Sequence, residues 1–272
     1  MANYNIEAVY KEISTIDGEF GVNMNQGHAS EFANSSIRKY CYLKSANRYG
    51  ICYDYLRMAS SGVINLLDNL KKYNLEYDKL AEYAILFLSY KLKQHSEHKS
   101  TNLNTVYTKD IEINKYYNNK IKDKGPTYKE IIDKKKDLMN TNEISKFNEA
   151  FSILCKLYTE CDKKKSYANC SNDARDFAKN FENLNQDSSI TGNSSYREIL
   201  SILSSDYDNF KSYCSEKCND CNDLPTLPKI KTPLTKLIPV LSTFPVIPVF
   251  LGIAYKTIFK KKIKKSKEEN ET

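Results

Sequence analysis

The feature that most constrains this chain is an uncharged apolar run near its C-terminal end, residues 237–255, with the sequence LIPVLSTFPVIPVFLGIAY. As a helix, its 19 residues would extend over about 28 Å, close to the ~30 Å hydrocarbon layer of a bilayer. Proline is tolerated in such a helix where serine or threonine side chains, water or neighbouring groups satisfy the freed carbonyls. We therefore predict one kinked transmembrane helix in preference to a buried strand or a re-entrant segment. Its reference positions are Leu237, Pro245, Pro248, Leu251 and Tyr255.

The placement of proline predicts the fold class of the rest of the chain. Of the seven prolines, Pro126 alone precedes Leu224, and proline-poor sequence of this length can sustain long helices. Apolar side chains recur at helical spacing, most regularly over residues 75–95 and 143–161. Because no alternating strand pattern of useful length is present, we predict an all-α multi-helix bundle. The expected helices cover residues 1–16, 52–73, 75–95, 102–122, 143–161 and 171–185, with others opening at Thr127 and Ser195, and residues 17–50 are expected to be loop with weak helix.

Two helix starts carry a recognisable signal. Thr127 with Glu130, and Ser195 with Glu198, have the spacing of a capping box. In this motif the hydroxyl side chain and the acid satisfy each other's backbone N–H groups at the first turn. We expect both pairs to open a helix.

Composition divides the chain into five parts. They are a variable N-terminal segment (1–50), a helical domain (51–221), an extended proline-rich stalk (222–236), the membrane helix (237–255) and a lysine-rich tail (256–272). The tail lysines are Lys256, Lys260, Lys261, Lys262, Lys264, Lys265 and Lys267. Lysines beside a membrane helix favour the cytosolic side and attract anionic lipid, so we expect a cytoplasmic tail, an outer helical domain and a lipid bilayer as partner. Because the basic excess is concentrated there, no nucleic-acid partner is expected.

Eight cysteines lie in the expected outer domain and none in the span or tail. They are Cys41, Cys52, Cys155, Cys161, Cys170, Cys214, Cys218 and Cys221. In an oxidising compartment they could form up to four disulfides, among 105 possible pairings. On one continuous helix Cys155 and Cys161 would be about 9 Å apart, too far to pair with each other. Reduced buried thiols are the alternative.

Catalytic and metal-binding patterns are weak. Cys214, Cys218 and Cys221 have the spacing of a radical-SAM iron–sulfur motif, but they end a helix beside prolines, so disulfides are expected instead. His95 and His98 flank Glu97 at a spacing of three, whereas metalloprotease helices need four, and both histidines are expected to be solvated. With three histidines and no glycine-rich phosphate loop, we expect no enzymatic activity, cofactor, metal or small-molecule substrate.

Three blocks resemble a known family. They are DKKKDLMNTNEISKFNEAFSILCKLYTE, FAKNFENLNQDSSITGNSSYREILSILSSDYDNFKSYC and KLIPVLSTFPVIPVFLGIAYK. They are similar to the Plasmodium interspersed repeat family, especially its rodent-malaria members, from about Cys52 to Lys256. The resemblance implies a helical variant antigen anchored once near its C-terminal end and exported to the infected red-cell surface or the vacuole membrane. It also implies antigenic variation and contact with a host receptor or antibody. The tail departs from the family pattern, and the segment before Cys52 matches poorly.

Two functions therefore compete. In the first, a surface antigen or adhesin exposes contact loops at Gly18–Gly50 and near residues 96–101, 162–170 and 186–194. In the second, the missing signal-peptide pattern and the short tail indicate a tail-anchored intracellular scaffold or trafficking adaptor with reduced cysteines. The lysine distribution and the resemblance favour the first.

Overall fold

The computed structural model describes residues 5–25, 28–43, 48–140, 142–163, 167–218 and 221–232. They belong to one compact unit that ends at Thr232. Residues 233–236 of the predicted stalk, the predicted membrane helix and the lysine-rich tail lie outside the described residues. Within the described ranges, no helix has both the length and the apolar character needed to cross a bilayer.

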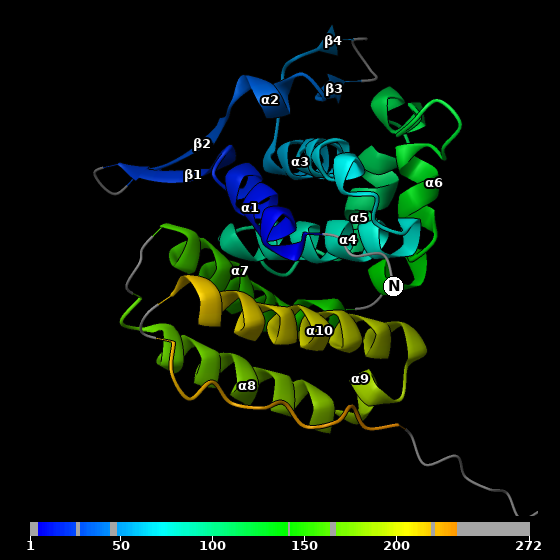
Figure 1. Ribbon diagram of the computed structural model, residues 1–272. Helices are drawn as coiled ribbons and strands as arrows, with labels where there is room; N and C mark the ends of the chain where they lie inside the picture. Colours follow the sequence, from blue (N-terminus) through cyan, green and yellow to red (C-terminus); the bar gives the residue numbers. More distant parts are fainter. Residues whose placement is uncertain are drawn as a thin grey trace, which may run out of the picture. The chain divides into compact units, whose positions relative to one another are not determined.

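The described chain is mostly helical, which confirms the main part of the predicted fold class (Figure 1). The α-helices are α1 (Ile6–Asp17), α2 (Ser35–Arg38), α3 (Tyr55–Leu70), α4 (Tyr77–Gln94), α5 (Leu103–Val106), α6 (Tyr128–Asp133), α7 (Asn148–Lys163), α8 (Cys170–Gln186), α9 (Ser188–Thr191) and α10 (Ser194–Lys217). Short 3-10 turns are η2 (Lys71–Tyr73), η4 (Lys115–Asn118), η5 (Lys136–Met139) and η6 (Glu143–Phe147), and η3 (Tyr107–Ile111) is a π-helical turn.

The long helices pack in two groups. Helices α7, α8 and α10 run side by side, and α3 packs against α4 with α6 beside it (Figure 1). Helix α1 contacts α3 in one group and α7 and α10 in the other, while α4 also contacts α7. The N-terminal residues are therefore part of the same core as the helices that follow residue 50.

The predicted apolar stripe over residues 143–161 is buried. Phe147, Phe151 and Leu154 are fully shielded from solvent, and Tyr158 nearly so. The ring of Tyr158 stacks on that of Tyr10 from α1, with centroids 4.6 Å apart. This aromatic contact connects α7 to α1, so the periodic pattern in the sequence does mark the core.

Buried tyrosine hydroxyls converge on one residue of α10. Tyr10 and Tyr83 donate hydrogen bonds to Oδ2 of Asp206 at 2.9 and 2.6 Å. Tyr158 donates to the backbone carbonyl of Asp206 at 2.7 Å. A polar group in a core needs such partners because an unpaired one is costly. Asp206 thus links α1, α4, α7 and α10.

The prediction of loop and weak helix over residues 17–50 was wrong, because this range contains four strands. Strand β1 (Phe20–Asn25) pairs antiparallel with β2 (His28–Ala33), and β3 (Tyr42–Leu43) pairs with β4 (Arg48–Tyr49). Among the residues of β1 whose burial is described, Phe20 and Gly21 are adjacent and both buried, so burial does not alternate there and the strand leaves little periodic signal. The ring of Phe20 lies against Gly62 of α3, where an added Cβ would come within 2.6 Å of the ring. Tertiary packing therefore holds a hairpin that local pattern did not reveal.

The helix predicted over 102–122 is broken into α5, η3 and η4. Asn114 ends one turn and begins the next, since its Oδ1 accepts from the amide of Tyr116 at 3.1 Å. Its Nδ2 donates to the carbonyl of Tyr40 at 3.1 Å. Asparagine side chains compete with the helical hydrogen-bond ladder in this way.

One predicted capping box is confirmed and the other was wrong. Thr127 and Glu130 satisfy each other's backbone amides at the start of α6. Helix α10 instead begins after Asn193, whose side chain accepts from the backbone amides of Ser195 and Tyr196, the second and third residues of the helix. Asparagine is as good a cap as serine, so Asn193 takes the position two residues before Ser195.

Residues 221–232, which we call the strap, run along α8 without helix or strand (Figure 1). Asn185 of α8 donates to the carbonyl of Lys229 at 2.9 Å and accepts from the amide of Lys231 at 2.8 Å. The apolar side chains at every third position, Leu224, Leu227 and Ile230, pack against the core. The strap therefore does not stand clear of the bundle as the predicted stalk would, because these contacts hold it to α8.

Candidate interaction surface

Two large apolar side chains are exposed on the described surface. Ile51 and Tyr53 are each 47% accessible to solvent, and they flank Cys52 in the segment that enters α3. Single exposed apolar side chains are common and indicate little by themselves. This pair is of interest because the backbone that carries it is held from several directions.

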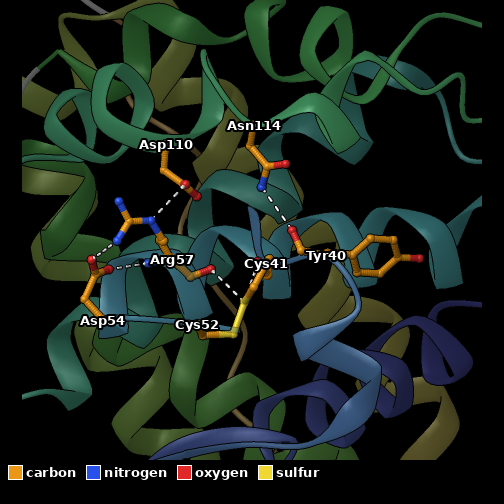
Figure 2. The surroundings of a disulfide bond; sticks show 8 residues. Tyr40, Cys41, Cys52, Asp54, Arg57, Asp110 and Asn114 are labelled. Atoms are coloured by element: carbon orange, nitrogen blue, oxygen red, sulfur yellow. Dashed lines mark hydrogen bonds and ion pairs between the residues drawn. A yellow bond between two sulfur atoms is a disulfide. The ribbon is translucent and has the colours of Figure 1, made fainter. Parts of the chain in front are cut away.

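A disulfide and a helix cap fix the backbone on both sides of the pair. Cys52 is bonded to Cys41, and their Cα atoms are 5.2 Å apart (Figure 2). The amide of Gly50 donates to the carbonyl of Cys41 at 3.1 Å, with a φ of 78° that glycine adopts readily. After the pair, the carboxylate of Asp54 caps α3 by accepting from the amide of Arg57 at 2.9 Å.

An ion-pair chain runs from this cap into the core. The guanidinium of Arg57 lies 2.5 Å from Oδ2 of Asp54, and its Nε is 4.0 Å from Oδ1 of Asp110 on η3 (Figure 2). Burial raises the pKa of the Asp110 carboxyl to about 7, while Ser60 and Arg57 act in the opposite direction. The start of α3 is thus connected to a buried acid on a neighbouring element.

The residue before Cys41 is fixed as well. The carbonyl of Tyr40 accepts from Asn114 at 3.1 Å (Figure 2). The hydroxyl of Tyr40 donates to Asp68 of α3 at 3.0 Å. Its ring meets that of Tyr116 edge to face, with centroids 5.7 Å apart. Both ends of the Cys41–Cys52 loop therefore rest on the folded core.

Exposed lysines lie on the segments that support the Cys41–Cys52 disulfide. Lys39 lies over the ring of Tyr40, with Nζ 4.7 Å from its centroid. Lys115 lies over the ring of Tyr42, whose partner in the β3–β4 ladder immediately precedes Gly50. We call Lys39, Ile51, Cys52, Tyr53 and Lys115 the Cys52 surface. Rigid apolar groups whose supporting segments carry cations suit contact with a protein that has an acidic rim around an apolar patch.

The contact ranges expected from sequence only partly include this surface. The range Gly18–Gly50 ends one residue before Ile51, so sequence reasoning missed Ile51 and Tyr53. The available signal was the presence of apolar residues on both sides of a cysteine directly before an aspartate cap. Near residues 96–101 the side chains are mostly exposed, and residues 186–194 include the short helix α9. Of residues 162–170, positions 164–166 lie outside the described ranges.

The expectation that His95 is solvated was wrong. His95 is only 6% exposed, and its Nε2 lies 3.0 Å from Oε1 of Glu31 on β2. Its Nδ1 accepts from the amide of Glu97 at 3.2 Å, so the ring proton is on Nε2 and is donated to Glu31. The ring also packs against Tyr55, with centroids 4.4 Å apart. Both nitrogens therefore serve structural hydrogen bonds: the Nε2 bond connects the end of α4 to the β1–β2 hairpin, and the Nδ1 bond stays within the turn that follows α4.

Seven of the eight candidate cysteines lie within disulfide reach of another cysteine. Cys41 is bonded to Cys52 and Cys161 to Cys218, while Cys221 lies within bonding reach of both Cys170 and Cys214 and can be bonded to one of them at a time. Cys155, also a candidate, is instead a free buried thiol, and burial raises its pKa. It lies on the face of α7 that contacts α1, whereas Cys161 lies at the end of α7 that meets Cys218.

The motif formed by Cys214, Cys218 and Cys221 is divided between different partners. Cys218 is bonded to Cys161 from α7, and Cys221 lies within bonding reach of Cys170 on α8 and of Cys214 on α10. Two groups of three sulfurs have the proximity that a thiolate metal site needs, namely Cys161, Cys214, Cys218 and Cys170, Cys214, Cys221. A metal would require these sulfurs to be thiolates, whereas disulfide sulfurs carry no charge to offer.

A cleft lies between α1, α4 and α7. It has a volume of about 180 Å³ and is lined by Asp17, Tyr90 and Cys155 among other residues. Sites for drug-sized ligands usually enclose about 300–1,000 Å³. The cleft is therefore small for an organic substrate.

Comparison with known proteins finds a matching family model and matching solved structures. The model of a family described as "Plasmodium variant antigen protein Cir/Yir/Bir" matches residues 10–256. A solved structure, "Structure of a Plasmodium PIR protein ectodomain", is 34% identical in sequence, covers 84% of this chain and 99% of its own, and superposes with a TM-score of 0.61. None of the curated proteins matches this chain. Because the family match begins at residue 10, it also includes most of the segment before Cys52.

Proposed function

This chain belongs to the Plasmodium variant antigen family Cir/Yir/Bir, and from that premise we propose that it is a membrane-anchored surface antigen whose helical domain contacts host molecules. The observation that carries the proposal is the pairing of this family membership with a disulfide-braced loop that exposes Ile51 and Tyr53. A rigid apolar pair loses little conformational entropy on binding, which favours its use as a contact.

Cysteine usage supports an outer location for the domain. Three disulfides can form at a time, using six cysteines, and disulfides persist in oxidising compartments and are rare in the cytosol. The solved relative is named an ectodomain, which agrees with a domain outside the membrane. The tail-anchored scaffold would instead keep these cysteines reduced.

For the anchor, the proposal relies on the sequence alone. The uncharged run over residues 237–255 would cross the membrane once, and the seven lysines after Tyr255 would face the cytosol and anionic lipid. The membrane would be the infected red-cell surface or the parasitophorous vacuole membrane. The partners would be the lipid bilayer and a host receptor or antibody, and we propose no enzymatic role.

Location is tested by protease treatment of intact infected cells that express an epitope-tagged full-length chain. We expect the helical domain to be cleaved from outside the compartment membrane and the tail to be protected. A non-reducing gel of the same sample should show faster migration than the reduced sample. Full protection of the domain together with eight free thiols would contradict the proposal and support the intracellular scaffold.

The contact surface is tested with paired variants of the same chain. Ile51→Ser combined with Tyr53→Ser should lower binding to host cells or to immune serum by about tenfold or more, since central apolar contacts dominate interfaces. Lys179→Ala, an exposed change on α8, is the matched control and should leave binding unchanged. Circular dichroism checks that both variants remain folded. Equal binding by the double variant and the control would exclude the Cys52 surface as the contact.

A further inference from the structure

We propose that Cys170, Cys214 and Cys221 form a three-sulfur exchange site, in which the disulfide of Cys221 moves between Cys170 and Cys214. The third sulfur is a thiol in each form. The site lies where the start of α8, the last turns of α10 and the start of the strap meet. The exchange stands independently of the antigen function proposed above.

The geometry brings both partners within bonding reach of Cys221. The Cα atom of Cys221 is 5.2 Å from that of Cys170 and 6.4 Å from that of Cys214. Both values fall inside the range of about 4.4–6.8 Å that disulfides need. The sulfurs of Cys170 and Cys214 are themselves 3.8 Å apart. One sulfur forms only one disulfide in a folded chain, so the two linkages are alternatives.

The neighbouring disulfide leaves an odd sulfur in this trio. Cys218, the remaining cysteine at this end of α10, is bonded to Cys161. Three sulfurs thus share a single disulfide. Cys170 and Cys214 are fully buried, so the thiol is shielded from bulk reagents in both forms. Cys221 is partly exposed, and it is bonded in both forms.

The exchange balances without any added oxidant or reductant. Starting from Cys170–Cys221, the Cys214 thiol loses its proton and the thiolate attacks the sulfur of Cys221. The Cys170–Cys221 bond breaks, a Cys214–Cys221 bond forms, and Cys170 leaves as a thiolate that takes up a proton. The chain holds one disulfide and one thiol before and after, which is ordinary thiol–disulfide exchange.

Loop length and native contacts favour different forms. Cys214 and Cys221 are 7 positions apart, and Cys170 and Cys221 are 51 apart. Because Cys161 stays bonded to Cys218, the shortest path between Cys170 and Cys221 is about 12 positions, 9 from Cys161 to Cys170 and 3 from Cys218 to Cys221. The probability of loop closure falls as about the 3/2 power of loop length, so the short Cys214–Cys221 loop is favoured about twofold in the unfolded chain. In the folded chain the hydroxyl of Ser171 donates to the carbonyl of Asn222 at 2.7 Å, which holds the strap beside Cys170. The folded chain should therefore be enriched in the Cys170 form.

The exchange decides how the connection between α7 and α8 is held. In the Cys170 form, this connection is cross-linked at both ends, through Cys161 and Cys170. In the Cys214 form, only the Cys161 end retains its disulfide. The site would therefore decide whether the start of α8 is cross-linked to the strap, while leaving the fold unchanged.

Mapping of disulfide peptides tests the proposal. Full-length protein is equilibrated in glutathione redox buffers, quenched in acid, alkylated with N-ethylmaleimide and digested with trypsin and Asp-N. Asp-N cleaves before Asp220 and so separates Cys218 from Cys221. We expect both Cys221 linkages in the native protein, with one alkylated sulfur in the trio. In urea without reductant, where the native contacts beside Cys170 are lost, the ratio should shift toward Cys214–Cys221 and approach about two to one.

Two variants provide the matched controls. Cys170→Ser should give only Cys214–Cys221, and Cys214→Ser only Cys170–Cys221, each with Cys161–Cys218 intact. The wild-type mapping decides the question even where a variant does not fold. A single Cys221 linkage under every glutathione ratio and in urea would overturn the proposal. The proposal would also be overturned if Cys170, Cys214 and Cys221 all escaped alkylation as thiolates and the protein retained one equivalent of bound metal.

Discussion

The buried carboxylate of Asp206 should make the stability of the folded domain depend on pH. It is fully shielded from solvent and accepts hydrogen bonds from Tyr10 and Tyr83 on one oxygen. The other oxygen has Lys79 at 3.9 Å. The perturbation we consider is Asp206→Asn, which keeps the size of the side chain and removes its titration.

The magnitude follows from the pKa. Burial raises the pKa of Asp206 from its ordinary 3.8 to about 6, while Lys79 and the two tyrosine hydroxyls act in the opposite direction. Since the folded state binds this proton more tightly, the stabilising contribution is full below about pH 4 and is lost as the pH rises through about 6. A difference of about 2 in pKa corresponds to about 3 kcal/mol in the free energy of unfolding.

The assay is urea unfolding followed by circular dichroism from about pH 4 to about pH 7, on wild type and variant in the same nonionic detergent. The free-energy difference, wild type minus Asp206→Asn, should fall by about 3 kcal/mol across this range. Asp208→Asn, an exposed change on the same helix, is the control and should preserve the wild-type pH dependence. A wild-type minus Asp206→Asn difference that is constant with pH would refute the reasoning.

Four further outcomes test other parts of the structure. Phe151→Ala should lower the free energy of unfolding by about 3–5 kcal/mol because it empties a core position, and a urea melt within the error of wild type would contradict this. Cys52→Ser should cost about 3 kcal/mol, given a loop of 11 positions, and unchanged melting would show that the disulfide does not constrain the loop. Asn193→Ala should cost about 1 kcal/mol and Ser195→Ala less than about half of that, and the reverse order would restore the predicted serine cap. Leu251→Arg should cost about 3 kcal/mol of membrane insertion, and undiminished pelleting in carbonate would argue against a span there.

Much of the helical scaffold could be predicted because its period is strong. The stripe with Phe147, Phe151 and Tyr158 repeats at the helical interval, and all three side chains are buried in the structure. Thr127 and Glu130 form a cap from purely local chemistry, so their spacing sufficed. Features that depend on neighbours in sequence alone were therefore readable.

Features that depend on distant residues were not readable. The β1–β2 hairpin is held by Phe20 against Gly62, a contact across the chain that no local period encodes. The cap of α10 had two suitable candidates, and only the path of the chain into the helix selects Asn193. The eight cysteines can pair in too many ways for the disulfides to be derived from their spacing. Ile51 and Tyr53 stand out as a contact surface only because the folded core fixes the backbone that carries them.

The strap has a mechanical consequence. A pulling force applied at Thr232 first acts on the hydrogen bonds of Asn185 with Lys229 and Lys231. It then acts in turn on the apolar contacts of Ile230, Leu227 and Leu224. Each of these contacts can break before the next one is loaded, so the strap detaches residue by residue. Detachment stops at Cys221, which is held by a disulfide. At about 3.4 Å per residue, the fully detached and extended strap is roughly 40 Å long. The domain could thus move away from a tethering point by that distance while every helix stays intact.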